Sequence, residues 1–232
     1  MATDVIIALD FPGEKEAFKF LENFDGLRPY VKVGMELFYS AGPELVRKLK
    51  AQGFRVFLDL KLHDIPNTVR QAMASLAVLG ADMVNLHAAG GSGMMRAALE
   101  GVSGQASRPL VIAVTQLTST DAEMLKDELL IGRGMEDTVL HYAKNAAVSG
   151  LDGVVCSPLE AAAIKRVCGD AFLTVTPGIR FEGDSADDQR RVTTPAEARK
   201  LGSDYIVVGR PITKAVNPRE IYERCVSEFL NK

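Results

Sequence analysis

The stretch "YVKVGMELFYSAGPELVRKLKAQGFRVFLDLK", residues 30–61, decides the fold of this chain. It begins and ends with short β-rich runs, "YVKVG" (30–34) and "RVFLDLK" (55–61). Between them, "GPELVRKLKAQG" (42–53) places aliphatic residues on one face of a helix and stops at a glycine. The order strand, helix, strand predicts a βαβ unit with parallel strands.

Runs of this kind recur along the whole chain, and eight of them fit into 232 residues, which matches a βα unit of about 30 residues. Eight strands alternating with helices favour a closed barrel over a doubly wound open sheet, because no G-x-G-x-x-G follows the first run. We therefore expect an α/β fold, a single-domain (β/α)8 TIM barrel spanning residues 1–232. The runs are "VIIALD" (5–10), "YVKVG" (30–34), "RVFLDLK" (55–61), "MVNLH" (83–87), "LVIAVTQL" (110–117), "GVVCS" (153–157), "FLTVTPG" (172–178) and "YIVVGR" (205–210).

Two helix starts carry capping-box spacing. Ser157 and Glu160 flank a proline at the first turn, and Thr194 and Glu197 repeat the pattern. The longest irregular stretch, residues 180–192, is polar and follows the seventh run. Such a loop is either a disordered connection or a lid over a ligand.

Composition and charge exclude several classes of protein. The net charge of −3 gives no basic surface for nucleic acid, although a few arginines could still bind a small anion. The N-terminal apolar run is too short for a signal peptide, and no stretch reaches the roughly 20 apolar residues of a membrane span. Three widely spaced cysteines, Cys156, Cys168 and Cys225, argue against a disulfide framework or a zinc site. We expect a soluble cytoplasmic protein.

Charged residues lie where the first three runs end. Asp59 and Lys61 alternate with leucines in "FLDLKL", Asp10 ends the first run, and Lys32 lies between two valines. Strand alternation predicts that all four side chains point into the mouth of the barrel, where catalytic groups of such barrels lie. Alternating signs would compensate the cost of burying them. A purely structural ion-pair network is the alternative, but a charge cluster in a cleft favours a functional site.

The last two runs indicate a phosphate site. The loops after strands seven and eight commonly hold phosphate in these barrels. In "VVGRPIT" (207–213), Gly209 would allow close approach to the backbone, and the forked guanidinium of Arg210 suits phosphate oxygens. An arginine on the surface is the alternative.

The histidines do not predict a metal site, because no two of them have ligand spacing. His63 should face away from the mouth, and His141 should be solvated. His87 ends the fourth run and could form hydrogen bonds near the site. Other residues that end or follow runs are Thr118, Ser157 and Arg180.

The stretch "DLKLHDIPNTV" (59–69) follows the pattern D-x-K-x-x-D-I-P-N-T. This pattern is the signature of the orotidine 5'-phosphate decarboxylase family, which the sequence resembles in its bacterial form. The similarity continues, in order, through "ALD" (8–10), "VKVG" (31–34), "QLTS" (116–119), "TPGIR" (176–180) and "VVGRPIT" (207–213). D-x-K-x-x-D alone occurs in related sugar-phosphate barrels, whereas the extension and "TPGIR" are more specific.

The resemblance implies decarboxylation of orotidine 5'-phosphate to uridine 5'-phosphate in de novo pyrimidine synthesis, by a homodimer without cofactor or metal. It implies that Asp64 and Thr68 reach into the partner's site, with Asp10 and Lys32 also at the ribose. Thr118 would lie at the pyrimidine. Phosphate would be bound by Arg180, Gln189, Gly209 and Arg210, with Gln189 bridging from the lid loop toward the base.

The chemistry of this reaction gives the charged residues their expected roles. Loss of carbon dioxide leaves an electron pair on C6 that the ring cannot delocalise, so a fixed positive charge must stand there beforehand. We assign this charge to the Lys61 ammonium, which then protonates C6, with Asp59 and Asp64 favouring its charged form. The site then has a net charge of −1, because it combines three carboxylates with two ammonium groups (Asp10, Asp59 and Asp64 with Lys32 and Lys61). A negative site fits a repulsive role of Asp59 toward the substrate carboxylate. Remote phosphate contacts and closure of residues 180–192 would offset this repulsion.

Two alternatives stay open. A Mg²⁺-dependent 3-keto-gulonate-6-phosphate decarboxylase or hexulose-phosphate synthase would share D-x-K-x-x-D but stabilise an enediolate. A non-catalytic nucleotide-binding barrel would bind a uridine phosphate without turnover. Activity that persists in excess chelator would argue against the Mg²⁺-dependent enzymes. Turnover of orotidine 5'-phosphate would exclude the non-catalytic binding protein.

Overall fold

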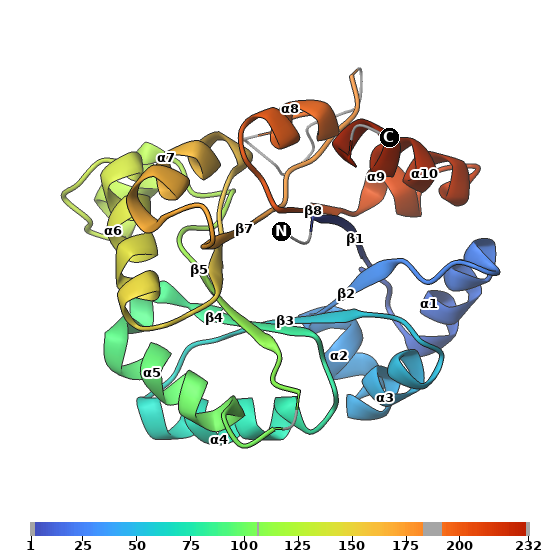
Figure 1. Ribbon diagram of the computed structural model, residues 1–232, viewed down its shortest axis with the longest axis horizontal. Coiled ribbons are helices and arrows are strands. Elements are labelled where there is room, and N and C mark those ends of the chain that lie inside the picture. Colours follow the sequence, from blue (N-terminus) through green and yellow to red (C-terminus); the bar gives the residue numbers. More distant parts are fainter. Residues whose placement is uncertain (1–2, 106, 183–191, 231–232) are drawn as a thin grey trace.

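The chain folds into a closed barrel of eight parallel strands, as the sequence predicts (Figure 1). The computed structural model describes residues 3–105, 107–182 and 192–230. Each strand pairs with the next along the chain, and β1 closes the barrel against β8. The strands are β1 (Asp4–Ala8), β2 (Tyr30–Gly34), β3 (Val56–Leu62), β4 (Met83–His87), β5 (Leu110–Val114), β6 (Gly153–Val155), β7 (Leu173–Thr176) and β8 (Tyr205–Val208).

Helices surround the strands on the outside (Figure 1). One of them, α2, follows β2 directly and was not predicted from the sequence. No described helix is long and apolar enough to cross a membrane. The helical segments are α1 (Glu14–Leu21), η1 (Glu22–Phe24), α2 (Met35–Ala41), α3 (Pro43–Ala51), α4 (Pro66–Ala77), η2 (Ala88–Gly90), α5 (Gly91–Val102), η3 (Met124–Glu128, a π-helical turn), α6 (Met135–Val148), α7 (Pro158–Cys168), α8 (Pro195–Lys200), α9 (Arg210–Thr213) and α10 (Pro218–Leu230).

Both predicted capping boxes are present and fix where α7 and α8 begin. Ser157 accepts the Leu159 N–H while Glu160 accepts the Ser157 N–H. Thr194 and Glu197 make the same reciprocal pair. The side chain of Ser157 is therefore used for capping.

Apolar side chains form two separate buried clusters. The larger lies between the strands and the helices, and the smaller combines alternate strand residues such as Ile6, Tyr30, Phe57 and Val207. Because alternate residues of a strand face opposite sides, this smaller cluster fills the inside of the barrel. Polar residues follow it in the same alternation, with Lys32 after Tyr30 and Asp59 after Phe57. The barrel is thus apolar at depth and charged at its mouth.

A repeated carboxylate clamp closes the opposite end of the barrel. Before β4, β6 and β8, an aspartate accepts a backbone N–H from the preceding strand and pairs with a basic side chain. The N-terminal ends of barrel strands serve stability rather than catalysis. The clamps are Asp82 with Val56 and Lys50, Asp152 with Val111 and Arg108, and Asp204 with Thr174 and Lys165.

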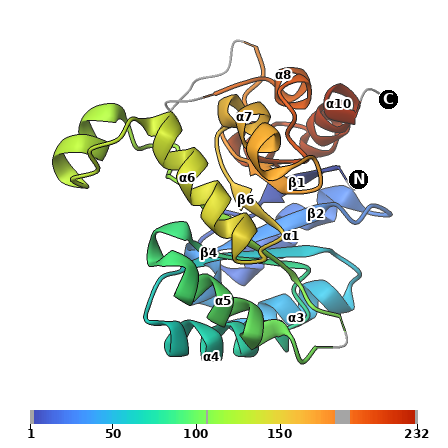
Figure 2. The same ribbon diagram turned by 60° about the vertical axis from the view of Figure 1, so that its left-hand side comes forward.

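The segment between β5 and α6 extends away from the barrel, as Figure 2 shows. It contains η3 and three exposed leucines, Leu117, Leu129 and Leu130. Its first residues, which follow β5 directly, lie beside the charged mouth.

Candidate active site

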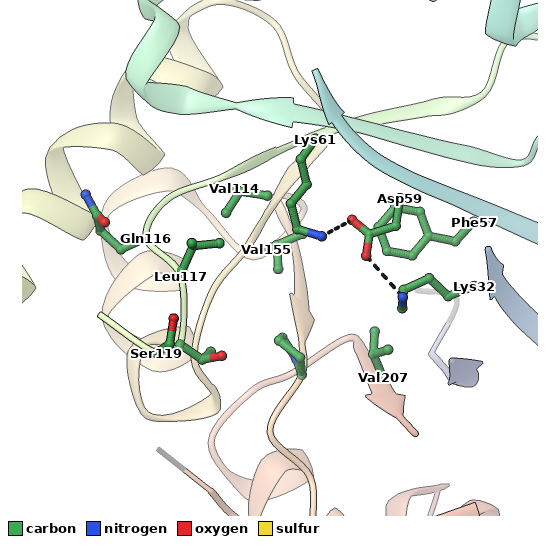
Figure 3. A pocket seen from close by; sticks show the side chains of 12 residues that line it. Lys32, Phe57, Asp59, Lys61, Val114, Gln116, Leu117, Ser119, Val155 and Val207 are labelled. Atoms are coloured by element: carbon green, nitrogen blue, oxygen red, sulfur yellow. Dashed lines mark hydrogen bonds and ion pairs between the residues drawn. The ribbon is translucent and has the colours of Figure 1, made fainter. Parts of the chain in front are cut away.

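Four charged side chains form one continuous row across the barrel mouth. Lys32 Nζ lies 3.1 Å from Asp10 Oδ1 and 3.3 Å from Asp59 Oδ2. Lys61 Nζ donates to Asp59 Oδ1 at 2.7 Å (Figure 3). The prediction that these residues meet with alternating signs is confirmed.

Burial and opposite charge compete at the centre of this row. Burial alone would raise the pKa of Asp59, but Lys32 and Lys61, with hydrogen bonds from Lys61 and Asn85, lower it below its ordinary value. Burial would lower the pKa of Lys32, but Asp59 and Asp10 outweigh it and raise that pKa. Both groups are therefore charged at neutral pH.

The backbone of Lys61 departs from a regular strand. Its φ is +51°, in the left-handed region that residues other than glycine rarely adopt. The pairing of β3 with β4 shifts between Leu58 and Leu62. The Lys61 side chain still lies at the mouth beside Asp59, as strand alternation predicts, while Leu58, Leu60 and Leu62 pack in the outer apolar cluster. The left-handed conformation of Lys61 costs on the order of 1–3 kcal/mol and persists only where surrounding contacts hold it.

Asn85 of β4 supplies such contacts and was not predicted as a site residue. Its amide donates to Asp59 Oδ1 at 2.6 Å and accepts the Lys61 backbone N–H at 2.8 Å. Asn85 could have been found from the sequence, because it is a polar residue between Val84 and Leu86 and shares the inward alternation of Met83.

A cavity of about 260 Å³ lies beside Lys61. Figure 3 shows Val114, Leu117 and Val155 on the side of Lys61 away from Asp59. Thr118, the residue expected at the pyrimidine, lines this cavity together with its neighbours Gln116 and Ser119, which were not predicted as site residues. An apolar slot with a few polar groups at its rim suits a flat heterocyclic ring.

A second cavity of about 460 Å³ adjoins the first, since Lys32, Pro177 and Val207 line both. Most of its charged lining is cationic. The predicted residues Asp10, Arg180, Gly209 and Arg210 line it, and so does Lys214, which was not predicted. A Cβ on Gly209 would meet only Ala8 and Asp10, at 3.6 and 3.8 Å, so protein packing alone does not require glycine there.

Other predicted residues lie outside these two cavities. Asp64 and Thr68 are exposed, and neither is among the described residues that line the cavities. Asp64 accepts the N–H of Ile65 at 2.6 Å. Gln189 and most of the predicted lid, residues 183–191, lie outside the described residues.

The two histidines near the mouth contact each other rather than the cavities. The rings of His63 and His87 lie 5.5 Å apart. Burial, then His63 and Lys61, lower the pKa of His87. Within the described part of the chain, no group of three or more His, Cys, Asp or Glu side chains is arranged to hold a metal ion.

Comparison with known proteins agrees with this geometry. The sequence profile of the family described as "Orotidine 5'-phosphate decarboxylase / HUMPS family" matches residues 3–225. Proteins named orotidine 5'-phosphate decarboxylase from Bacillus cytotoxicus and Bacillus cereus are 60% and 58% identical over 227 residues, covering 96% of this chain and 95% of theirs.

Solved structures give the same result. A crystal structure of orotidine 5'-phosphate decarboxylase from Lactobacillus acidophilus has a TM-score of 0.88 at 44% identity, covering 98% of this chain and 99% of that one. An uncharacterized conserved protein from Geobacillus kaustophilus has a TM-score of 0.87 at 55% identity, covering 97% of this chain and 99% of that one. On this evidence the chain belongs to the orotidine 5'-phosphate decarboxylase / HUMPS family.

Proposed function

We propose that this chain decarboxylates orotidine 5'-phosphate to uridine 5'-phosphate, a step of de novo pyrimidine synthesis, without metal or cofactor. The observation that carries the proposal is the Lys61 ammonium, held 2.7 Å from Asp59 on the wall of an apolar slot. Relatives about 60% identical over nearly the whole chain bear the name of this activity.

The substrate fits the two adjoining cavities by its chemistry. The pyrimidine ring occupies the slot beside Lys61 and Thr118, and the phosphate occupies the cationic cavity at Arg180 and Arg210. The ribose lies between them, where Lys32 borders both cavities. Gly209 leaves room for the phosphate to approach the backbone.

The reaction breaks the bond between C6 and the carboxylate. Carbon dioxide leaves, and the electron pair of the broken bond stays on C6. The Lys61 ammonium already stands beside this carbon, so it stabilises the growing negative charge without reorganisation. Lys61 then transfers a proton to C6, which forms the C6–H bond of the product, and the neutral amine regains a proton from water.

Asp59 has two roles in this proposal. It fixes Lys61 by the hydrogen bond between them, and its negative charge disfavours the substrate carboxylate until carbon dioxide leaves. Binding energy from the remote phosphate offsets that repulsion. Gln189 would add a phosphate contact, which stays a prediction.

The active form in this proposal is a homodimer in which Asp64 and Thr68 enter the partner's site. Two observations support it: both residues are exposed, and the large side chain of Ile65, next to Asp64, is 67% exposed. Mixing inactive Lys61→Ala and Asp64→Ala chains tests the arrangement. Subunit exchange would rebuild one intact site in each mixed dimer, so about a quarter of all sites should recover. No recovery, despite exchange shown by differently tagged subunits, would refute shared sites.

The test of the function is the ultraviolet absorbance change of orotidine 5'-phosphate with purified protein, with and without excess EDTA. Equal turnover in both supports the proposal. Failure with this substrate, together with Mg²⁺-dependent turnover of a keto-sugar phosphate, would instead favour the sugar-phosphate enzymes. Tight binding of uridine 5'-phosphate with no turnover would favour a binding protein.

A further inference from the structure

Asn85 lies behind the charged row and contacts two of its members at once. The side chain belongs to β4 and is almost fully enclosed, with 1% of the residue exposed. Its amide N–H donates to Asp59 Oδ1 at 2.6 Å, and the same oxygen accepts Lys61 Nζ at 2.7 Å. Its amide oxygen accepts the Lys61 backbone N–H at 2.8 Å.

The strand pairing shows why this contact is needed. Leu58 pairs with Val84 and Leu62 pairs with Leu86, so three residues of β3 lie opposite the single residue Asn85. The regular ladder is interrupted there, and the Asn85 side chain supplies the acceptor for the Lys61 N–H. A buried N–H without an acceptor would cost on the order of 1–3 kcal/mol.

We infer that Asn85 is a positioning residue for Lys61: it holds the bulge that aims the ammonium at C6. The inference rests on the proposed function. Only a side chain that accepts and donates at the same time satisfies both the Lys61 N–H and the Asp59 carboxylate. Without it, the left-handed conformation of Lys61 loses its support and can relax to an ordinary strand conformation. Asn85 is not among the described residues that line the two cavities, so it acts through Lys61 and Asp59.

The first variant is Asn85→Ala. We expect kcat for orotidine 5'-phosphate to fall about 100-fold, as for a displaced reacting group. The affinity for uridine 5'-phosphate should stay within about threefold, because the phosphate and ribose contacts are untouched. Turnover is expressed per site that binds uridine 5'-phosphate, so unfolded protein does not enter the comparison.

The second variant, Asn85→Asp, keeps the shape of the side chain and adds a dependence on pH. Its ionised form lacks the donor to Asp59 and places a second negative charge beside it. Its protonated form regains a donor. The ratio of variant to wild-type kcat should therefore rise as the pH falls from 8 to 5. A residue that only supports the fold would give a flat ratio.

Thr174→Val is the matched control. Thr174 is fully buried and also donates to a carboxylate, that of Asp204, at the opposite end of the barrel. Removing the Thr174 hydroxyl should lower the melting temperature of the protein but leave kcat per site unchanged. The inference alone is overturned if the unchanged chain turns over substrate and Asn85→Ala keeps kcat within threefold. It is also overturned if the ratio of Asn85→Asp kcat to wild-type kcat does not change with pH. The same holds if Asn85→Ala lowers the affinity for uridine 5'-phosphate as much as it lowers kcat. Absence of turnover in the unchanged chain would instead overturn the proposed function, and the inference with it.

Discussion

The Lys61 ammonium and the Asp59 carboxylate lie 2.7 Å apart on one wall of an apolar slot. The other Asp59 oxygen lies 3.3 Å from Lys32, so the carboxylate is shared by two cations. This sharing holds Lys61 in position before substrate arrives. Pre-positioned charge is the physical basis of the proposed reaction, because it needs no reorganisation when charge develops on the ring.

Lys61→Ala should abolish turnover while the barrel survives. The substitution removes both the fixed positive charge and the proton donor, which together correspond to a loss of about 10⁴-fold or more. The initial rate of absorbance loss measures it, and circular dichroism checks the fold. Lys48→Ala is the control, since it removes an exposed ammonium paired with Glu14 on the outer surface. Near-normal turnover by Lys61→Ala would show that Lys61 is not the proton donor to C6.

Arg210→Ala should damage turnover of the phosphorylated substrate far more than turnover of orotidine. A charged hydrogen bond to phosphate contributes about 1.5–3 kcal/mol, so kcat/KM for the phosphate ester should fall by roughly 10- to 150-fold. Orotidine lacks the phosphate, and its kcat/KM should change less than about threefold. Arg219→Ala, which removes an arginine paired with Glu223 on α10, should change neither. Equal losses on both substrates would show that Arg210 does not bind phosphate.

Gly34→Ala should disturb the charged row from its Lys32 end. A Cβ on Gly34 would lie 3.0 Å from Lys32 Nζ and 3.5 Å from Asp10 Oδ1, so the ammonium must shift. We expect the KM for orotidine 5'-phosphate to rise about 10-fold, because Lys32 borders both cavities.

Gly134→Ala is the control for this prediction. Both glycines precede a helix with an extended backbone, but a Cβ on Gly134 meets nothing within 4 Å. Any general cost of alanine at the start of a helix is therefore the same in both variants. If the two variants had the same KM, the steric argument would be wrong.

His87 should make the stability of the protein depend on pH below 6.5. Burial, then His63 and Lys61, lower its pKa below the ordinary value of 6.5. In the window between the two pKa values the unfolded chain binds a proton that the folded chain does not, so the free energy of unfolding falls as the pH falls. The slope should stay below about 1.4 kcal/mol per pH unit, the limit for one proton, because the ring is only half-buried.

Urea unfolding of His87→Asn at several pH values between 5 and 7.5 measures this effect. The stability advantage of the wild type over the variant should shrink toward pH 5. His141→Asn removes an exposed imidazole and should keep the wild-type slope. A slope in His87→Asn as steep as that of the wild type would contradict the prediction.

Several features of the molecule were predictable from the sequence alone. The eight apolar runs and the helices between them determine a parallel barrel, because each run can be buried on both faces only inside such an architecture. The capping boxes at Ser157 and Thr194 are local and were also predictable. The same holds for the placement of Asp10, Lys32 and Asp59 at one end of the barrel, which follows from parallel strands and the period of two along each.

Only the tertiary structure decided how Lys61 is held. Its left-handed backbone conformation and the support from Asn85 depend on the pairing of β3 with β4, two segments about 25 residues apart that no local pattern relates. The position of the Lys32 ammonium against Gly34 of the same strand is likewise set by tertiary contacts, its ion pairs with Asp10 and Asp59. Composition and alternation fix which faces are buried, whereas strand register and side-chain contacts across the barrel fix where a charge lies to within an ångström.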